Sequence, residues 1–353
     1  MLAAVVEKPG QLVVREVPLP VIDETECLVE ILACGICNST DRKLLDGHFR
    51  YKGPDAYPGI LGHEAVGRVL ECGAAVESFQ VGDLVLRPGA SYAPGAGPTS
   101  MYGGLAQYGK IKDPRHGGSP MHQVVPPELD PVDATLLVTL KETLSWLQRW
   151  FASSGGAGAA RPGAGVPPAH DSLVVLGSGP VGLSFAWFAR LLGCHPVIVL
   201  GRRDEPLRRA LDMGLDAVIN TTRDDPREIV NAWTNGRGAD RVIEAVGDEA
   251  VLQMGLSLLS PQGRLGVYGI AATRAPGDME RRAVDLGLAR NEWALEFFSP
   301  QEAAPHEQML WLVKQSLVKL QDWYTHVVPL EETPRGFDLL ARQGAFKVVV
   351  RMT

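Results

Sequence analysis

Apolar and polar positions follow different patterns in the two halves of the chain. In the first half, short apolar or alternating runs are separated by glycine and proline, which is typical of short strands joined by turns. These runs predict strands at 12–17, 26–31, 65–71 and 82–86. We therefore expect a β-rich, barrel-like domain in this half.

The second half carries longer, continuous apolar runs. Residues 172–176 form an uninterrupted apolar run bounded by glycine, which favours a strand buried on both faces, and a helix-like stretch follows as far as Leu192. The further predicted strands lie at 196–200, 217–220, 241–246 and 263–268. Strands that alternate with helices indicate a doubly wound parallel sheet, so the predicted fold class is α/β. The tail adds a predicted helix over 301–319 and a last strand over 346–351.

Composition narrows the class of protein. The chain has 353 residues, 45% of them hydrophobic and 21% charged, and a net charge of -7. These values are ordinary for a globular protein of two domains, and the negative charge argues against nucleic acid or an anionic membrane as a partner. The first charge comes too early for a signal peptide, no apolar run is long enough to span a membrane, and the five cysteines are scattered. We expect a cytoplasmic protein with reduced thiols.

The stretch at 153–168 is rich in glycine, alanine and proline. This composition is typical of a flexible surface loop, and we expect no catalytic role for it.

A glycine pattern follows the first strand of the second half. Residues 177–182 read GSGPVG, between a predicted buried strand and a predicted helix. Gly177 would make the turn, Gly179 would admit the pyrophosphate, and Gly182 would let helix and strand pack closely. The predicted cofactor contacts in this loop are Gly177, Gly179, Pro180, Val181 and Gly182. The alternative is a glycine-rich turn without a ligand.

The end of the next strand indicates which dinucleotide is bound. An NAD site carries Asp or Glu there, to bond the ribose hydroxyls. Here the strand ends in Gly201, followed by Arg202 and Arg203, whose guanidinium groups suit a 2′-phosphate. The sequence therefore favours NADP(H). The alternative is that both arginines are solvated at the start of a helix and that NAD is accepted.

Two segments of the first half complete a resemblance to a known family. Residues 35–41 (GICNSTD) and 59–67 (GILGHEAVG), followed by the glycine loop, resemble the zinc-dependent medium-chain dehydrogenase/reductase family of alcohol, sorbitol and glucose dehydrogenases. Further similar segments lie at 103–108, 240–247 and 326–332. The resemblance covers nearly the whole chain. It implies a β-rich GroES-like catalytic domain at 1–151, a Rossmann nucleotide-binding domain at 170–298, and a return to the catalytic domain at 299–353. It also implies cofactor contacts at Val246 and Gly269.

The resemblance implies one catalytic zinc. Its ligands would be Cys37, His63 and Glu64, and the metal would act as a Lewis acid on the oxygen of the substrate. A hydroxyl group beside the metal would relay the proton. Ser39 keeps the family's spacing from the cysteine, whereas Thr40 keeps the contact with the following Asp41, so all three residues are predicted catalytic residues and the choice between the hydroxyls stays open.

One position departs from the family pattern. Val138 stands where the family usually supplies another ligand, and valine cannot bind a metal. Either Glu64 completes the site, or Glu142 reaches in by a change of helical register, or zinc binding is weak or absent. Residues 84–120 contain no cysteine, so we predict that the family's structural zinc is absent.

The leading hypothesis is a zinc-assisted NADP(H)-dependent oxidoreductase that interconverts a secondary alcohol, polyol or sugar and its carbonyl. Arg42, His48 and Glu142 would bond sugar hydroxyls, or else are surface charges. The alternatives are a zinc-free quinone or enone reductase of the same superfamily, favoured by Val138, and a non-catalytic dinucleotide-binding protein. The resemblance also implies a homodimer or homotetramer.

Overall fold

The structure is a computed structural model that describes residues 1–48, 54–153, 170–269, 295–296 and 301–352. It divides into two compact units, one formed by Met1–Lys141 with Ala303–Thr353 and the other by Glu142–Glu302. The domain bounds given above stay predictions. The glycine-rich stretch predicted to be a flexible loop lies almost entirely outside the described residues. None of the described helices is long and apolar enough to cross a membrane.

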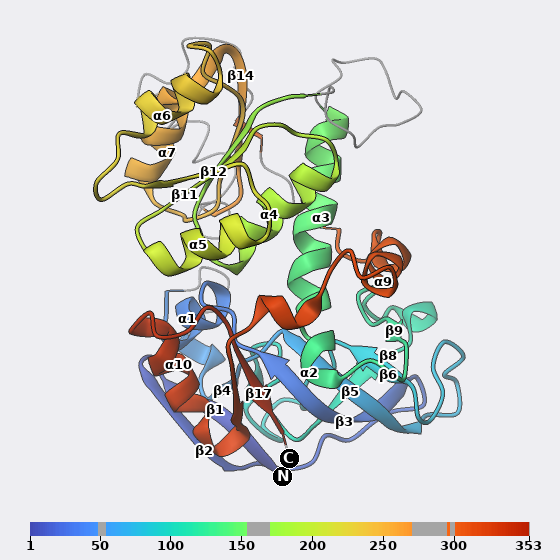
Figure 1. The fold of residues 1–353 in the computed structure, drawn as a ribbon. Coiled ribbons are helices and arrows are strands. Elements are labelled where there is room, and N and C mark those ends of the chain that lie inside the picture. Colours follow the sequence, from blue (N-terminus) through green and yellow to red (C-terminus); the bar gives the residue numbers. More distant parts are fainter. Residues whose placement is uncertain (49–53, 154–169, 270–294, 297–300, 353) are drawn as a thin grey trace. The chain divides into compact units, whose positions relative to one another are not determined.

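The first unit is built from β-strands (Figure 1). Its strands are β1 (Leu2–Lys8), β2 (Gln11–Glu16), β3 (Glu26–Gly35), β4 (Gly59–Ile60), β5 (Glu64–Cys72), β6 (Leu84–Leu86), β7 (Thr99–Ser100), β8 (Tyr108–Lys112), β9 (Val124–Val125), β16 (His326–Pro329) and β17 (Val348–Arg351). They form one sheet in the order β2-β1-β4-β7 and another in the order β16-β17-β3-β5-β6-β9, with β8 also pairing β3. Five of these strands correspond to the predicted ones, whereas β1, β4, β7, β8, β9 and β16 were not predicted.

Helices in or entering this unit are short apart from α3. They are α1 (Thr40–Leu45), α2 (Pro131–Ala134), α3 (Leu136–Ser153), α9 (His306–Lys314) and α10 (Thr333–Ala341). The helix predicted over 301–319 is therefore too long. Ser316 has a φ of 55°, a left-handed backbone conformation that cannot continue a helix.

The second unit holds the predicted parallel sheet. Its strands are β10 (Leu173–Leu176), β11 (Val197–Gly201), β12 (Ala217–Asn220), β13 (Ala239–Glu244), β14 (Leu259–Val267) and β15 (Leu295–Glu296), in the order β12-β11-β10-β13-β14-β15. The helices described beside them are α4 (Pro180–Leu191), α5 (Asp204–Asp212), α6 (Pro226–Trp233) and α7 (Glu249–Ser257). All four residues of β10 are buried, because helices cover both faces of such a sheet. The α/β fold class is confirmed.

Strand order identifies where a ligand would bind to this sheet. From β10 the chain runs outward through β11 and β12, then returns to the other side of β10 with β13. The order therefore reverses between β10 and β13. In open parallel sheets, ligands bind at the carboxyl ends of the strands at such a reversal.

Candidate functional site

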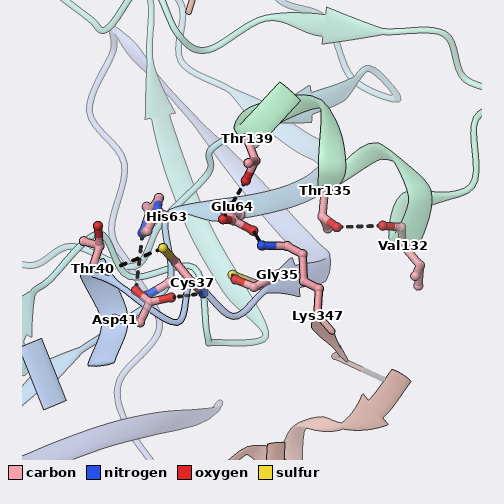
Figure 2. Close-up of polar contacts among 12 residues, drawn as sticks. Gly35, Cys37, Thr40, Asp41, His63, Glu64, Val132, Thr135, Thr139 and Lys347 are labelled. Carbon is pink, nitrogen blue, oxygen red and sulfur yellow. Dashed lines mark hydrogen bonds and ion pairs between the residues drawn. The ribbon is translucent and has the colours of Figure 1, made fainter. Parts of the chain in front are cut away.

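Three potential metal ligands lie together in the first unit. Cys37, His63 and Glu64 each offer one ligand atom, and these atoms all lie within 4.8 Å of one another (Figure 2). Cys37 follows the end of β3, and Glu64 begins β5, which pairs antiparallel with β3. Because adjacent strands bring the two segments together, Cys37 and Glu64 lie close to each other although they are 27 residues apart in the sequence.

Asp41 orients the residues of this cluster through hydrogen bonds. It is fully buried, and its carboxylate accepts hydrogen bonds from the backbone N–H of Cys37 at 2.9 Å and of Gly62 at 3.3 Å. The Nδ1 atom of His63 lies 3.3 Å from Asp41 Oδ1. A carboxylate at Nδ1 leaves Nε2 free for a metal and makes the ring a better ligand. Among the three residues predicted as catalytic, Asp41 therefore lies where it can position the ligands.

The two hydroxyl candidates lie differently. Ser39 precedes α1, is exposed and makes no side-chain cap. Thr40 is half-buried, and its backbone N–H donates to Cys37 Sγ at 3.4 Å. Figure 2 shows Thr40 on the same side of the cluster as Cys37 and His63. This placement favours Thr40 as the group that relays a proton.

Glu64 is held by partners that the sequence did not reveal. Its Oε2 lies 2.5 Å from Lys347 Nζ, and its Oε1 accepts a hydrogen bond from Thr139 Oγ1 at 2.9 Å (Figure 2). Glu64 and Lys347 are 2% and 5% exposed, so this is a buried ion pair. Gly35 makes room for it, because a Cβ there would overlap the carboxylate.

Electrostatics in the cluster reflect burial and neighbouring charges. Burial alone would raise the pKa of Glu64, but Lys347 and then His63 outweigh it and lower that pKa. Burial likewise opposes charge on His63, yet the carboxylate of Asp41 raises the pKa of His63 well above its ordinary value. This shift in the pKa of His63 favours the protonated imidazole beside Asp41.

The remaining candidates lie apart from the cluster or have other partners. Val138 is buried on α3, one residue before Thr139. The carboxylate of Glu142 accepts a hydrogen bond from Tyr268 at 2.6 Å. Arg42 pairs with Asp46 at 2.8 Å.

One aromatic ring borders the cluster. The ring of Tyr102 lies 5.1 Å from that of His63 and is 45% exposed. Its φ of 78° is a strained conformation for a bulky residue, and such strain gathers at functional sites.

The predicted cofactor loop lies at the carboxyl end of β10. Gly177 has a φ of 125°, and Gly179 caps α4 with nothing within 4 Å of an added Cβ. At Gly182 a Cβ would overlap the carbonyl of Gly177, so close packing of helix on turn requires glycine. Pro180 is the first residue of α4, and a helix N-terminus beside open space suits a phosphate.

Val246 and Gly269 belong to the same edge of the sheet. An added Cβ on Gly177 would lie 3.2 Å from Val246 Cγ2. Gly269 donates its N–H to Glu244 at the end of β13, and a Cβ there would overlap the backbone of Val246. The structure thus brings these predicted cofactor residues together around the strand reversal.

The first acidic residue after β11, where an NAD site carries Asp or Glu, already has partners. Gly201 ends the strand, Arg202 is exposed, and Arg203 is half-buried. The nearest acid, Asp204, bonds Arg223 and Asn220 at 2.8 Å each. Because Asp204 has these partners, it is poorly placed to serve a ribose diol.

Known proteins with similar sequences and structures agree with this geometry. The family model for the alcohol dehydrogenase GroES-like domain matches residues 23–119, and that for zinc-binding dehydrogenase matches 180–290. An alcohol dehydrogenase of Cupriavidus necator is 28% identical, with 99% of this chain and 98% of the relative covered. An uncharacterized zinc-type alcohol dehydrogenase-like protein of Haemophilus influenzae is 30% identical, with 78% of each chain covered.

A solved structure resembles the chain over its full length. It is a candidate zinc-binding dehydrogenase of Sinorhizobium meliloti 1021 bound to NADP, with 25% identity, a TM-score of 0.75 and 99% of both chains covered. Together with the paired β-rich and parallel-sheet units, these matches show that the chain belongs to the zinc-dependent medium-chain dehydrogenase/reductase family of oxidoreductases.

Proposed function

We propose that the protein is an NADP(H)-dependent dehydrogenase that uses one catalytic zinc ion to interconvert a secondary alcohol or polyol and its carbonyl compound. The buried cluster of Cys37, His63 and Glu64 carries this proposal. A thiolate, an imidazole and a carboxylate are the donors that zinc prefers, and three protein ligands leave a fourth position for a substrate oxygen. The spacing of these donors therefore fits the ion.

Each neighbour of the cluster would have a separate task. Zinc, when bound, supplies a Lewis acid that stabilises negative charge on the substrate oxygen, while the nicotinamide exchanges the hydride. Asp41 holds His63 by its Nδ1 atom so that Nε2 stays available. Thr40, beside Cys37, relays the proton of the substrate hydroxyl. Tyr102 forms a wall beside His63 that restricts the shape of the substrate.

The partners of two charged side chains narrow the proposed substrate class. Arg42, one of the groups predicted to bond sugar hydroxyls, is engaged with Asp46, and Glu142 is engaged with Tyr268. These contacts favour a secondary alcohol or a small polyol over a sugar that needs several charged partners. A cytoplasmic homo-oligomer remains our expectation.

Arg202 and Arg203 support the choice of NADP(H). They follow Gly201 at the carboxyl edge of the sheet, where Asp204 is already paired. A 2′-phosphate would receive charge-assisted hydrogen bonds from guanidinium groups there. The related Sinorhizobium meliloti protein bound to NADP is consistent with this choice.

Metal and cofactor are tested together on the purified full chain. Zinc content is measured by mass spectrometry, and rates are measured with both cofactors on a panel of secondary alcohols and polyols. We expect one zinc per chain, lost in Cys37→Ser, and a KM for NADP that rises at least tenfold in the Arg202→Ala/Arg203→Ala variant. Arg237→Ala, before the amino end of β13, is the matched control. A strong preference of the wild type for NAD would refute the cofactor proposal.

Val138 supports a second candidate function, because valine stands where the family usually has a metal ligand. A zinc-free NADPH-dependent quinone or enone reductase would retain activity after removal of all metal. Metal-free protein that still reduces an enone with NADPH, and does not gain activity when zinc is added, would support that function and contradict the first.

A further inference from the structure

Two cysteines face each other across the β3–β5 pair, away from the metal cluster. Cys27 near the start of β3 lies directly opposite Cys72 at the end of β5. The N–H of Gly73 donates to the carbonyl of Glu26, so the neighbouring pair is the hydrogen-bonded one. Cys27 and Cys72 therefore form a non-hydrogen-bonded pair, in which opposite side chains approach most closely.

The two thiols are already in contact. Cys27 Sγ donates to Cys72 Sγ, and the sulfur atoms are 2.8 Å apart. The Cα atoms of a non-hydrogen-bonded pair lie about 4.5 Å apart, within the range that a disulfide requires. A bond of about 2.05 Å would therefore need a movement of side chains and not of the backbone.

The surroundings give the two sulfurs different access to solvent. Cys27 is fully buried and packs with Val29, Val69 and Phe79, whereas Cys72 is only partly buried at the border of this apolar cluster. Burial, together with the neighbouring thiol, raises the pKa of Cys27 far above its ordinary value. A reagent from solvent would thus reach Cys72 first, and Cys27 would act as its internal partner.

We propose that Cys27 and Cys72 are a thiol oxidation site that closes to a reversible disulfide when the protein meets a hydroperoxide. The hydroperoxide oxidises Cys72 to a sulfenic acid and is itself reduced to the corresponding alcohol, or to water in the case of hydrogen peroxide. The thiol of Cys27 then attacks that sulfur, and one water leaves as the disulfide forms. The two thiols together give up two electrons and two protons, and a dithiol reductant returns them.

The disulfide would lock the strands that position the metal cluster. Cys37 follows β3 by two residues, and Glu64 is the first residue of β5. The cluster therefore lies at the carboxyl end of β3 and the amino end of β5. Cys27 and Cys72 lie at the opposite end of this strand pair and are already in register. Cross-linking them would stabilise the pair without displacing Cys37 or His63, and it would spare the metal ligand by taking up oxidant elsewhere.

The test uses the full-length, zinc-loaded protein and hydrogen peroxide as the probe. After treatment and alkylation of remaining thiols, we expect a non-reducing peptide map to show the segments of Cys27 and Cys72 joined, with a loss of two hydrogens. Dithiothreitol should reverse the link. Because the cross-link closes a loop of 45 residues, the unfolding midpoint should rise by on the order of 5–10 °C in the oxidised form.

Variants separate this site from the metal ligand. Cys72→Ser should abolish the joined peptide and the rise in midpoint, whereas Cys37→Ser should keep both. Wild-type protein that shows Cys72 overoxidised or alkylated while Cys27 remains a free thiol would overturn the proposal. So would a disulfide that includes Cys37. The wild-type map alone decides the matter should a variant fail to fold.

Discussion

Lys347→Met is the perturbation that best tests the role assigned to Glu64. The change removes the cation that faces Glu64 Oε2 at 2.5 Å and fills the same space with an apolar side chain. Glu64 would then be a buried carboxylate that still accepts a hydrogen bond from Thr139. Removing one partner of a buried ion pair costs about 3–5 kcal/mol.

Protonation limits that cost in the metal-free protein. Glu64 can become neutral by taking up a proton, which costs about 1.4 kcal/mol for each pH unit above its ordinary pKa of about 4.3. The limit is therefore about 4 kcal/mol at pH 7. In the wild type the pKa of Glu64 is lowered, so this pair stabilises the fold above about pH 4.3 and the stabilisation is lost as the pH falls. In the variant the pKa of Glu64 is raised, so the penalty grows as the pH rises. The difference between the two proteins should therefore shrink toward pH 4.3.

Zinc should offset part of the loss. If Glu64 is a ligand, the metal supplies the positive charge that Lys347 no longer gives, and the zinc-bound variant loses less stability than the metal-free one. Recovering half of the penalty, about 2 kcal/mol, would tighten zinc binding about 30-fold.

The assay is urea unfolding of metal-free and zinc-saturated protein between pH 5 and 8, with zinc affinity measured against a competing chelator at pH 7. Lys8→Met, at the exposed end of β1, is the matched control. The double variant Glu64→Gln/Lys347→Met should show neither the pH dependence nor the gain in affinity. A penalty independent of pH, or zinc affinity that is unchanged in Lys347→Met, would refute the reasoning.

Three further substitutions test other contacts within the first unit. Asp41→Asn should weaken zinc binding about 10–100-fold in the chelator assay, because the carboxylate no longer orients the ring of His63; unchanged affinity would show that Asp41 does not position that ligand. Val138→Glu should lower the stability of the metal-free protein by several kcal/mol by burying an unpaired carboxylate, and zinc should restore that stability in thermal unfolding if the position faces the metal. Asp113→Ala should cost about 3 kcal/mol in urea unfolding at pH 7, because its buried carboxylate accepts four hydrogen bonds from residues that include Ser78; hydrogen bonds hold the pKa of Asp113 below its ordinary value against burial, so the loss should diminish below pH 4.

The parallel sheet could be predicted because its strands are buried on both faces. Residues 173–176 and 217–219 are apolar without interruption, and they form β10 and most of β12. Short strands of the first unit carry no such signal. Strand β4 has two residues, and it exists because it pairs with both β1 and β7. Pairing between distant segments decides these elements, and the local pattern does not record it.

The grouping of the three candidate ligands could be predicted from the sequence, whereas the residues that support them could not. Resemblance placed Cys37, His63 and Glu64 together, as the structure does. Lys347 was not identified, because it lies 283 residues after Glu64 in the sequence. One signal was present: a lysine stands between Phe346 and an apolar run that forms β17, and a charge in such a position needs a buried partner.

The charges of Lys347 and Asp41 make the candidate site suitable for a divalent cation. Lys347 balances the charge of Glu64, and the raised pKa of His63 favours an imidazolium that balances the charge of Asp41. In the proposed site, zinc would bind Cys37 as a thiolate and His63 as a neutral imidazole, so its two positive charges would replace two protons. The site can then accept the metal without placing an uncompensated charge in the interior of the protein. That balance holds with valine at position 138, whereas a further carboxylate there would leave one negative charge in excess.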